Sequence, residues 1–276
     1  MNEIEVLAAG PLTTVQDRGR PGWAHIGVPP SGAVDPPAYE RGNRLVGNEL
    51  GAAALEATMV GPRLRFNAPA LVALTGAVSR GPFEVGAGEV LDVGPCRGGV
   101  RVYVSVRGGI DVGPVLGSRS TDLMSALGPP PLQDGELLSI GPEPANRPQE
   151  LEPPRSPPEE PVLRVLPGPR DDWFEPSALE ALSGPWQVGL NSNRIGVRLE
   201  GPQLERARHD ELLSEGLVTG ALQVPPSGQP ILLLNDHPTT GGYPVIGVVH
   251  AADLPLAGQL RPGQTLRLEV NQGSQP

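Results

Sequence analysis

The sequence contains no lysine, because all 21 of its basic residues are arginine. This absence excludes a Schiff-base lysine, a pyridoxal phosphate enzyme, a P-loop lysine and a biotinylation site within these residues. Cysteine occurs once, at Cys96, so neither an internal disulfide nor a cysteine zinc cluster can form. The four histidines lack metal-ligand spacing, and no resident metal is expected.

Aromatic side chains are also scarce, at 3% of the chain, and no apolar run approaches the ~18 residues of a transmembrane helix. The first twenty residues are too polar for a signal peptide. The net charge of −10 argues against nucleic acid or an anionic membrane as the main partner, since both attract a basic surface. We therefore expect a soluble, cytoplasmic protein that binds neither.

Glycine and proline are abundant instead, with 37 and 35 residues. That excess is typical either of disorder or of a tightly turned β protein. The segments 100–106 and 265–270 alternate apolar and polar residues, as half-buried strands do. Further short apolar segments bounded by turns favour the β interpretation; they span 70–77, 162–166, 230–236 and 243–249.

Helical pattern is rare, which favours β-barrels or sandwiches over a doubly wound sheet. One helix is predicted after Asp35, a good N-cap residue that is followed by Pro36. A second is predicted over residues 176–182. The fold class is therefore mainly β with few short helices.

One segment is predicted to be a spacer. Residues 142–161 contain eight prolines and almost no apolar side chains, so they favour a semi-extended polyproline conformation. The spacer divides the chain into an N-terminal β domain, residues 1–141, and a C-terminal β domain, residues 162–276. Exchange of segments between the two domains is left open.

Short strings recur in the two parts in a different order. Val-Pro-Pro-Ser-Gly occurs at 28–32 and at 224–228, and Asn-Arg followed by an aliphatic residue occurs at 43–45 and at 193–195. A Gly-Pro-x-Leu string, which chance alone explains well, also occurs twice. Together the strings suggest two related domains with shuffled order, whose equivalent loops flank a shared ligand cleft.

The segment 13–35 is the first of two segments that are dense in polar side chains suited to binding or catalysis. Glycines and prolines fix its backbone around polar side chains, namely Thr13, Thr14, Gln16, Asp17, Arg18, Arg20, Ser31 and Asp35. Arginines such as Arg18 and Arg20 suit bidentate contact with a carboxylate or phosphate. The alternative is a solvated loop in which Asp17 pairs locally with an arginine.

The segment 214–254 is the second segment that is dense in such polar side chains. Its polar residues fall at predicted strand ends and turns: Ser214, Glu215, Gln223, Ser227, Gln229, Asn235, Asp236, Thr239, Thr240 and Tyr243. The Thr-Thr-Gly-Gly-Tyr turn offers hydroxyls and bare N–H groups to an anion, although a simple hairpin turn is the alternative. His237, before a proline, is either a general base or an exposed turn residue. Asn193, Arg194 and Glu200 form a weaker candidate group.

These segments resemble the carboxyltransferase A/B-domain family. The resemblance is carried by TTVQDRGRPGWAHIGVPPSGAVDPPAYERGNRLVGN, SNRIGVRLEGP and VPPSGQPILLLNDHPTTGGYPVIGVVHAADL. The family includes the C subunit of 5-oxoprolinase (KipA) and the carboxyltransferase domain of urea carboxylase. The resemblance implies two cyclophilin-like β-barrel domains. It also implies an ATP-dependent 5-oxoprolinase complex, in which this chain, a KipI-like B subunit and a larger A subunit hydrolyse 5-oxo-L-proline to L-glutamate.

The resemblance also implies site residues and a co-substrate. ATP with Mg²⁺ is expected, bound either here or mainly by a partner subunit. Asp17, Glu215 and Asp236 are the candidates for proton transfer or metal-nucleotide contact. The candidates for substrate or phosphate binding are Gln16, Arg18, Arg20, Ser31, Asn193, Arg194, Gln223, Ser227, Thr239, Thr240 and Tyr243, and the family motifs also cover Asp35, Asn43, Asn48, Glu200, Ser214 and Gln229.

The sequence departs from some family members at Pro238 and Val245, where others carry glutamine and lysine. A lysine contact at that turn is therefore not available. Two alternative functions stay open. One is a biotin-dependent carboxyltransferase component acting on urea or a related amide, with biotin supplied on another polypeptide. The other is a non-catalytic regulatory protein that binds a KipI-type kinase inhibitor.

Overall fold

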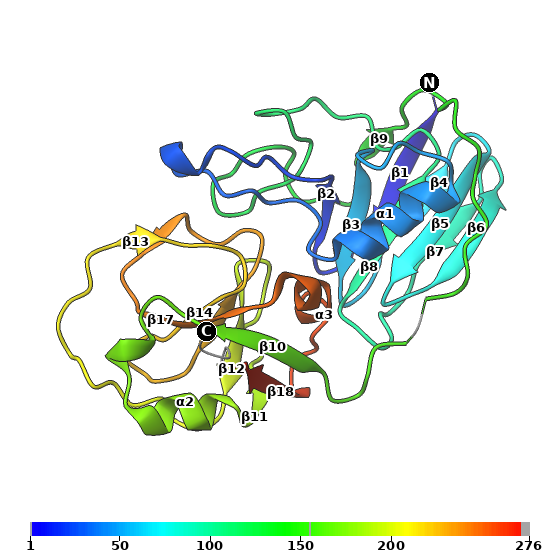
Figure 1. Cartoon of the computed structure of the whole chain (residues 1–276). Coiled ribbons are helices and arrows are strands. Elements are labelled where there is room, and N and C mark those ends of the chain that lie inside the picture. The colour runs from blue at the N-terminus through cyan, green and yellow to red at the C-terminus, as the bar shows by residue number, and fades with distance from the viewer. Residues whose placement is uncertain (1, 155, 272–276) are drawn as a thin grey trace. The chain divides into compact units, whose positions relative to one another are not determined.

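The chain folds into two compact units, each built mainly from β-strands (Figure 1). The computed structural model describes residues 2–154 and 156–271. Unit 1 consists of Met1–Pro21 and Ser31–Ser156, and unit 2 consists of Gly22–Pro30 and Pro157–Pro276. The mainly β prediction is confirmed. Within the described residues, no helix has the length and apolar character needed to cross a bilayer.

Unit 1 contains a four-stranded and a five-stranded antiparallel sheet. The first has the order β7 (Val90–Asp92), β4 (Arg63–Phe66), β1 (Glu3–Ala8), β9 (Leu137–Ser139). The second has the order β2 (Thr13–Gln16), β3 (Ala54–Thr58), β8 (Arg101–Val106), β5 (Ala70–Gly76), β6 (Arg80–Val85). Apolar residues of both sheets, such as Ile4, Leu64, Val72 and Val104, form one buried core.

The alternation predicted for 100–106 is present in β8, but both faces of the strand are buried. The valines face the core, whereas the polar face is covered by α1 (Pro36–Leu45). On that face Tyr103 donates a 2.7 Å hydrogen bond to Glu56, and Arg101 pairs with the same carboxylate at 3.5 Å. Helix α1 begins as predicted, because Asp35 caps it by accepting from the Ala38 N–H. The Asp35 N–H also donates to the Tyr103 hydroxyl at 2.8 Å, so this buried polar layer fixes the start of the helix to the sheet.

The predicted spacer is in part a docked segment of unit 1, which we call the strap (residues 143–152). Arg107 holds it through Glu143 at 3.0 Å and through the carbonyls of Pro144 and Asn146, each at 3.0 Å. Arg41 donates to the Leu151 carbonyl at 3.1 Å. The Leu151 side chain packs on a small apolar cluster under α1. The rest of the predicted spacer includes Arg155, which lies outside the described residues.

Unit 2 contains a closed barrel of seven strands. Their order is β10 (Val162–Pro167), β17 (Val245–Val249), β14 (Ala221–Gln223), β15 (Ile231–Leu233), β12 (Gly196–Glu200), β11 (Pro185–Val188), β18 (Thr265–Val270). The barrel closes through β10 and β18, its one parallel pair among the described strands. A separate ribbon pairs β13 (Glu215–Gly216) with β16 (Thr240–Gly241).

Short helices complete unit 2. They are η1 (Ala24–Ile26), η2 (Asp171–Trp173), α2 (Pro176–Leu182), η3 (Ala251–Asp253) and α3 (Leu254–Ala257). Helix α2 has the bounds that the sequence predicts, with Pro176 at its first position. Trp186, at the start of β11, is fully buried and donates its indole N–H to the Leu182 carbonyl at 3.0 Å. This bond ties the end of α2 to the barrel.

Candidate functional site

In unit 1 three loops meet, and we call them together the loop cluster (residues 16–20, 31–35 and 118–122). Asp17 lies at its centre and is buried. Its Oδ1 accepts hydrogen bonds of 2.6 Å from the hydroxyls of Ser118 and Ser120 and one of 2.8 Å from the Gly19 N–H. Its Oδ2 accepts from the Arg119 N–H at 2.6 Å. Four donors converge on this carboxylate, which therefore organises the loops around it.

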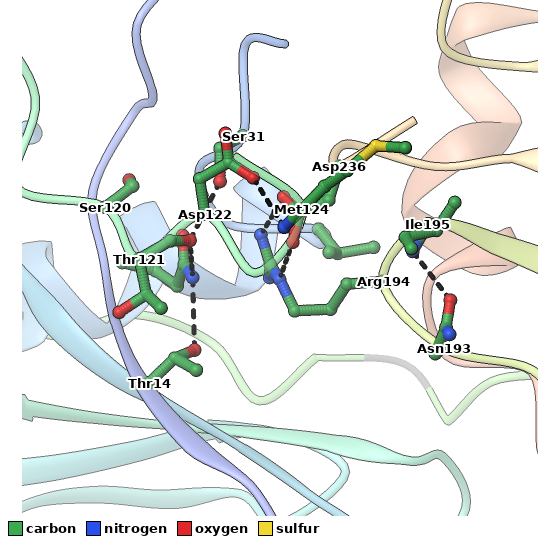
Figure 2. Close-up of polar contacts among 12 residues, drawn as sticks. Thr14, Ser31, Ser120, Thr121, Asp122, Met124, Asn193, Arg194, Ile195 and Asp236 are labelled. Atoms are coloured by element: carbon green, nitrogen blue, oxygen red, sulfur yellow. Dashed lines mark hydrogen bonds and ion pairs between the residues drawn. The ribbon is translucent and has the colours of Figure 1, made fainter. Parts of the chain in front are cut away.

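Gln16 and Ser31 attach two of the loops to the third, and Figure 2 shows Ser31 with Thr121 and Thr14. The amide nitrogen of Gln16 donates to the Thr121 carbonyl at 3.0 Å and to the Thr14 hydroxyl at 3.1 Å. The Ser31 hydroxyl donates to the same Thr121 carbonyl at 2.9 Å. Among the residues that the structure describes, none hydrogen-bonds Gln16 Oε1, Thr121 Oγ1 or Asp122 Oδ2, although all three atoms are buried. They are polar groups that an external hydrogen-bond donor would satisfy.

The backbone of the loop 31–35 is held in a conformation that favours glycine. Ser31 and Gly32 have φ values of 51° and 86°. A Cβ atom on Gly32 would lie 2.7 Å from the Gly19 nitrogen, so the first two loops touch through their backbones. The Val34 N–H donates to the buried Glu56 carboxylate at 3.0 Å. The loop is therefore fixed before any ligand arrives.

The two arginines of the first loop have different environments. Arg20 is buried, and its guanidinium donates to the carbonyls of Ser120 and, at 3.3 Å, Val115. Arg18 has a side chain that is 55% exposed and pairs with Glu40 at 2.8 Å. An exposed ion pair of this kind contributes little to stability. Of the two arginines of the first loop, Arg18 is thus the one that can exchange its partner for an anion.

In unit 2, Arg194 and Asp236 form a buried, two-pronged ion pair (Figure 2). The guanidinium Nε and Nη2 donate to the two carboxylate oxygens at 2.8 and 3.0 Å. The Asp236 N–H also donates to the Arg194 carbonyl at 3.1 Å. This geometry fixes the planes of both groups. The pair fastens the turn after β15 to the turn before β12.

Glu215 lies on the β13–β16 ribbon opposite Gly241. Its carboxylate pairs with the guanidinium of Arg170, and the Nε–Oε2 distance is 3.1 Å. This hydrogen-bonded guanidinium lowers the pKa of Glu215, against a smaller opposing effect of desolvation. Thr240 is exposed on the same ribbon. The group presents one hydroxyl and one guanidinium at the surface of unit 2.

Gln223 and Tyr243 stand next to this ribbon. The Gln223 side chain donates to the Tyr243 carbonyl at 3.2 Å, and a Cβ on Gly241 would lie 2.6 Å from its amide nitrogen. The ribbon thus lies directly against the Gln223 side chain, which would have to shift for a larger residue at position 241. The Tyr243 side chain is half exposed. The Thr239 carbonyl accepts a hydrogen bond from the Leu217 N–H at 2.9 Å.

Two predicted binding residues, Asn193 and Ser227, form hydrogen bonds within their own turns. Asn193 Oδ1 accepts from the N–H groups of Ile195 at 2.8 Å and Gly196 at 3.3 Å, which builds the turn into β12 (Figure 2). The Ser227 hydroxyl accepts from the Gln229 N–H at 3.4 Å in a similar turn. Both contacts are of the Asx- and ST-turn type. In this structure these side chains shape loops.

The structure thus gathers the predicted residues into three groups. The group in unit 1 is Gln16, Asp17, Arg18, Arg20 and Ser31. The two groups in unit 2 are the pair Arg194 and Asp236, and the set Glu215, Gln223, Thr240 and Tyr243. Sequence reasoning missed the third loop of the cluster, residues 118–122, and also Arg170. The run Ser-Arg-Ser-Thr-Asp after Gly117 was the available signal. In the described residues no three His, Cys, Asp or Glu side chains gather as metal ligands.

Comparison with known proteins identifies the family to which this chain belongs. Residues 26–270 match the family described as carboxyltransferase domain, subdomain A and B. The chain belongs to this carboxyltransferase family. It is 39% identical to the 5-oxoprolinase C subunit of Escherichia coli (strain K12) over 278 residues, which cover 95% of this chain and 89% of that protein.

Solved structures in the comparison agree with the family assignment. The crystal structure of TTHA0988 superimposes with a TM-score of 0.88 and 37% identity, over 97% of this chain and 55% of that one. The crystal structure of the K. lactis urea amidolyase gives 0.90 and 35%, over 96% of this chain and 18% of that one. The family fold is therefore also carried inside much longer polypeptides.

Proposed function

We propose that this chain belongs to an ATP-dependent 5-oxoprolinase complex, which hydrolyses 5-oxo-L-proline to L-glutamate together with a KipI-like B subunit and a larger A subunit. The observation that supports this most is the match to nearly the full length of a 5-oxoprolinase C subunit. The urea amidolyase matches involve a small part of a longer chain. The chain is active only with its partner subunits in this proposal.

The chemistry of the loop cluster in unit 1 suits a lactam that carries a carboxylate. Such a substrate needs a cation for the carboxylate, acceptors for the ring N–H and donors for a developing oxyanion. Arg18 is an exposed guanidinium held at a rigid loop. Gln16 Oε1 and Asp122 Oδ2 are oxygen acceptors without a donor among the described residues. A ring N–H is the kind of donor that these oxygens lack.

The candidate acids have roles that follow from their contacts. Asp17 accepts four hydrogen bonds, and Asp236 is paired with Arg194 through both oxygens. We therefore assign Asp17 and Asp236 to positioning the loops. Glu215 orients Arg170 in the same way. Proton transfer then falls to another group.

ATP is proposed as the co-substrate, bound with Mg²⁺ mainly by a partner subunit. Among the described residues of this chain no three His, Cys, Asp or Glu side chains gather as metal ligands. In this proposal, the role of this chain is to bind and orient the organic substrate.

The test is coexpression of this chain with its A- and B-type partners and an assay of glutamate release that depends on ATP and 5-oxoproline. We expect activity that is lost when this chain is omitted. Arg18→Gln should raise KM for 5-oxoproline, since it removes the anion contact. Arg63→Gln is the matched control, because its side chain is also 55% exposed and pairs with an acid, Asp92, at 3.6 Å. Activity that persists without this chain contradicts the proposal.

A biotin-dependent carboxyltransferase acting on urea or a related amide is the second candidate. The family description and the 34% identity to the urea amidolyase of Lachancea kluyveri favour it. Carboxylation of urea by this chain with a biotinylated carrier, in place of lactam hydrolysis, would decide for that function. The regulatory alternative predicts partner binding with no turnover in either assay.

A further inference from the structure

A cavity of about 300 Å³ lies in unit 1, between the end of helix α1 and the strap. Its volume is at the lower end of the range for small-ligand sites. The helix end and the turn after it contribute Arg44, Gly47 and Glu49, and the strap contributes Asn146, Arg147 and Gln149. All of these residues belong to unit 1, and none of them belongs to the loop cluster.

Hydrogen bonds hold the two walls of this cavity together. The Gln149 N–H donates to the Arg44 carbonyl at 3.1 Å. The Asn146 side-chain amide donates to the Glu49 carboxylate at 2.7 Å. Gly47 has a φ of 73°, and a Cβ there would lie 2.8 Å from the Asn146 carbonyl oxygen, so the strap passes directly against the turn. The cavity therefore exists only while the strap is docked.

Two arginines of the cavity lack a close acidic partner. Arg147 is exposed and makes no hydrogen bond or ion pair with any residue that the structure describes. The Arg44 side chain is 46% exposed, and its ion pair with Glu40 spans 3.9 Å, which is too long for a hydrogen bond. Glu49 already accepts from Asn146. In a chain whose net charge is −10, the cavity thus carries a local excess of positive charge.

Guanidinium groups on two facing walls suit an oxyanion, because each can donate two N–H groups to it. A tetrahedral phosphate directs oxygens to both walls at once, whereas a carboxylate presents its two oxygens in one direction. We propose that the cavity is a phosphate-binding site, in which Arg44 and Arg147 bind a phosphate group that is either free or part of a small phosphorylated compound. This site goes beyond the proposed function and does not rest on it.

Binding at this site has a consequence for the strap. The phosphate connects Arg147 of the strap to Arg44 of α1, so it binds the docked form and not the open one. A ligand of this kind makes opening rarer by a factor of one plus the ratio of its concentration to Kd. At ten times Kd, opening becomes roughly tenfold rarer. The Gln149 N–H reports this opening, because its hydrogen bond to Arg44 breaks when the strap leaves.

The first experiment is a titration of the full chain with inorganic phosphate at constant ionic strength, followed by calorimetry. We expect saturable binding at a single site. Arg44→Gln and Arg147→Gln should each weaken it by about tenfold or more, since each removes a charged donor. Arg65→Gln is the matched control, because its side chain is 47% exposed and pairs with Glu5 away from the cavity.

Two results of this titration would overturn the proposal. One is that the wild-type chain does not bind phosphate. The other is that Arg65→Gln weakens binding as much as the two cavity variants, which would indicate attraction to the surface in general. Circular dichroism checks that the variants are folded, which we expect because exposed arginines without short ion pairs contribute little to stability.

The source of the phosphate group is decided by comparing ligands. Tighter binding of glycerol 3-phosphate than of inorganic phosphate would identify a phosphorylated compound as the ligand, and the reverse order would identify the free ion. Succinate should bind more weakly than both, because its carboxylates lack the tetrahedral arrangement of oxygens. Succinate that binds as tightly as phosphate would overturn the assignment to phosphate.

The second experiment measures hydrogen exchange of the Gln149 N–H by NMR in the full chain. Phosphate at ten times Kd should slow it roughly tenfold in the wild type and leave it unchanged in Arg147→Gln. The Gly263 N–H of unit 2, which donates to the Val188 carbonyl at 2.7 Å, is the internal control. Unchanged Gln149 exchange in a chain that binds phosphate would refute the link to the strap. Neither experiment depends on glutamate release, so failure of the proposed function is distinguishable from failure of this one.

Discussion

The Oδ1 atom of Asp17 lies 2.6 Å from the hydroxyl of Ser120, which follows it by 103 positions in the sequence. With the contact to Ser118, this bond joins the end of β2 to the third loop of the loop cluster. A carboxylate that accepts several hydrogen bonds in this way holds together the loops that donate them. Loss of the Asp17 carboxylate should therefore affect the folding of unit 1 and not only a reaction at the loop cluster.

Asp17→Asn should therefore destabilise the protein by about 2–4 kcal/mol, because an amide N–H would face donors that need an acceptor. Urea unfolding followed by circular dichroism measures the change. Asp111→Asn is the matched control, since Asp111 is an exposed acid of the same unit whose side chain makes no hydrogen bond among the described residues. Equal unfolding midpoints for the two variants would show that the donors find other acceptors.

The buried pair of unit 2 should show strong coupling in a double-mutant cycle. Arg194→Met or Asp236→Leu alone removes one side of a buried ion pair, which costs about 3–5 kcal/mol. The double variant should lose much less than the sum of the two. Additive losses would mean that the two groups stabilise the fold independently.

The strap should detach when its arginine contacts are removed. Arg107→Met deletes the contacts to Glu143, Pro144 and Asn146, so transient opening of the segment becomes more frequent. Cleavage after Glu150 by a glutamate-specific protease should then be several-fold faster. Arg147→Met is the control within the strap, because this exposed side chain makes no hydrogen bond or ion pair in the described part of the chain. Equal cleavage rates would refute the docking role of Arg107.

Cys96 gives a pH-dependent probe of folding. Burial raises the pKa of its thiol to about 11, although a backbone contact with Met59 and the charge of Arg101 oppose this. Because the thiolate is the reactive form, Ellman's reagent at pH 8 should react about 100-fold more slowly with the folded chain than with the chain in urea. The native rate should rise as the pH approaches 11. Equal rates in buffer and in urea would contradict this.

The local structure was predictable where backbone chemistry decides it. Asp35 with Pro36, and Pro176 at a first helical position, predicted both longer helices, because capping depends on neighbouring residues alone. The alternating and short apolar segments predicted strands for the same reason. The burial of both faces of β8 was not predictable, because it depends on α1 packing from elsewhere in the sequence.

The site was predictable only in part. Polar density in two segments identified Asp17 and Glu215, but their partners Ser120 and Arg170 lie far away in the sequence. The repeated strings also take different structures: Asn43 lies in α1, whereas Asn193 builds a turn before β12. Short strings carry no information on which distant segment covers them. The docking of the proline-rich strap was missed for that reason.

The parallel pairing of β10 with β18 sets Val162 beside Arg267 and Val165 beside Val270. The first and last strands of the barrel are thus neighbours at the seam where it closes. A polypeptide that continues past either strand departs from the barrel without breaking a hydrogen bond of the sheet. The barrel can therefore lie within a longer polypeptide without losing the hydrogen bonds that close it.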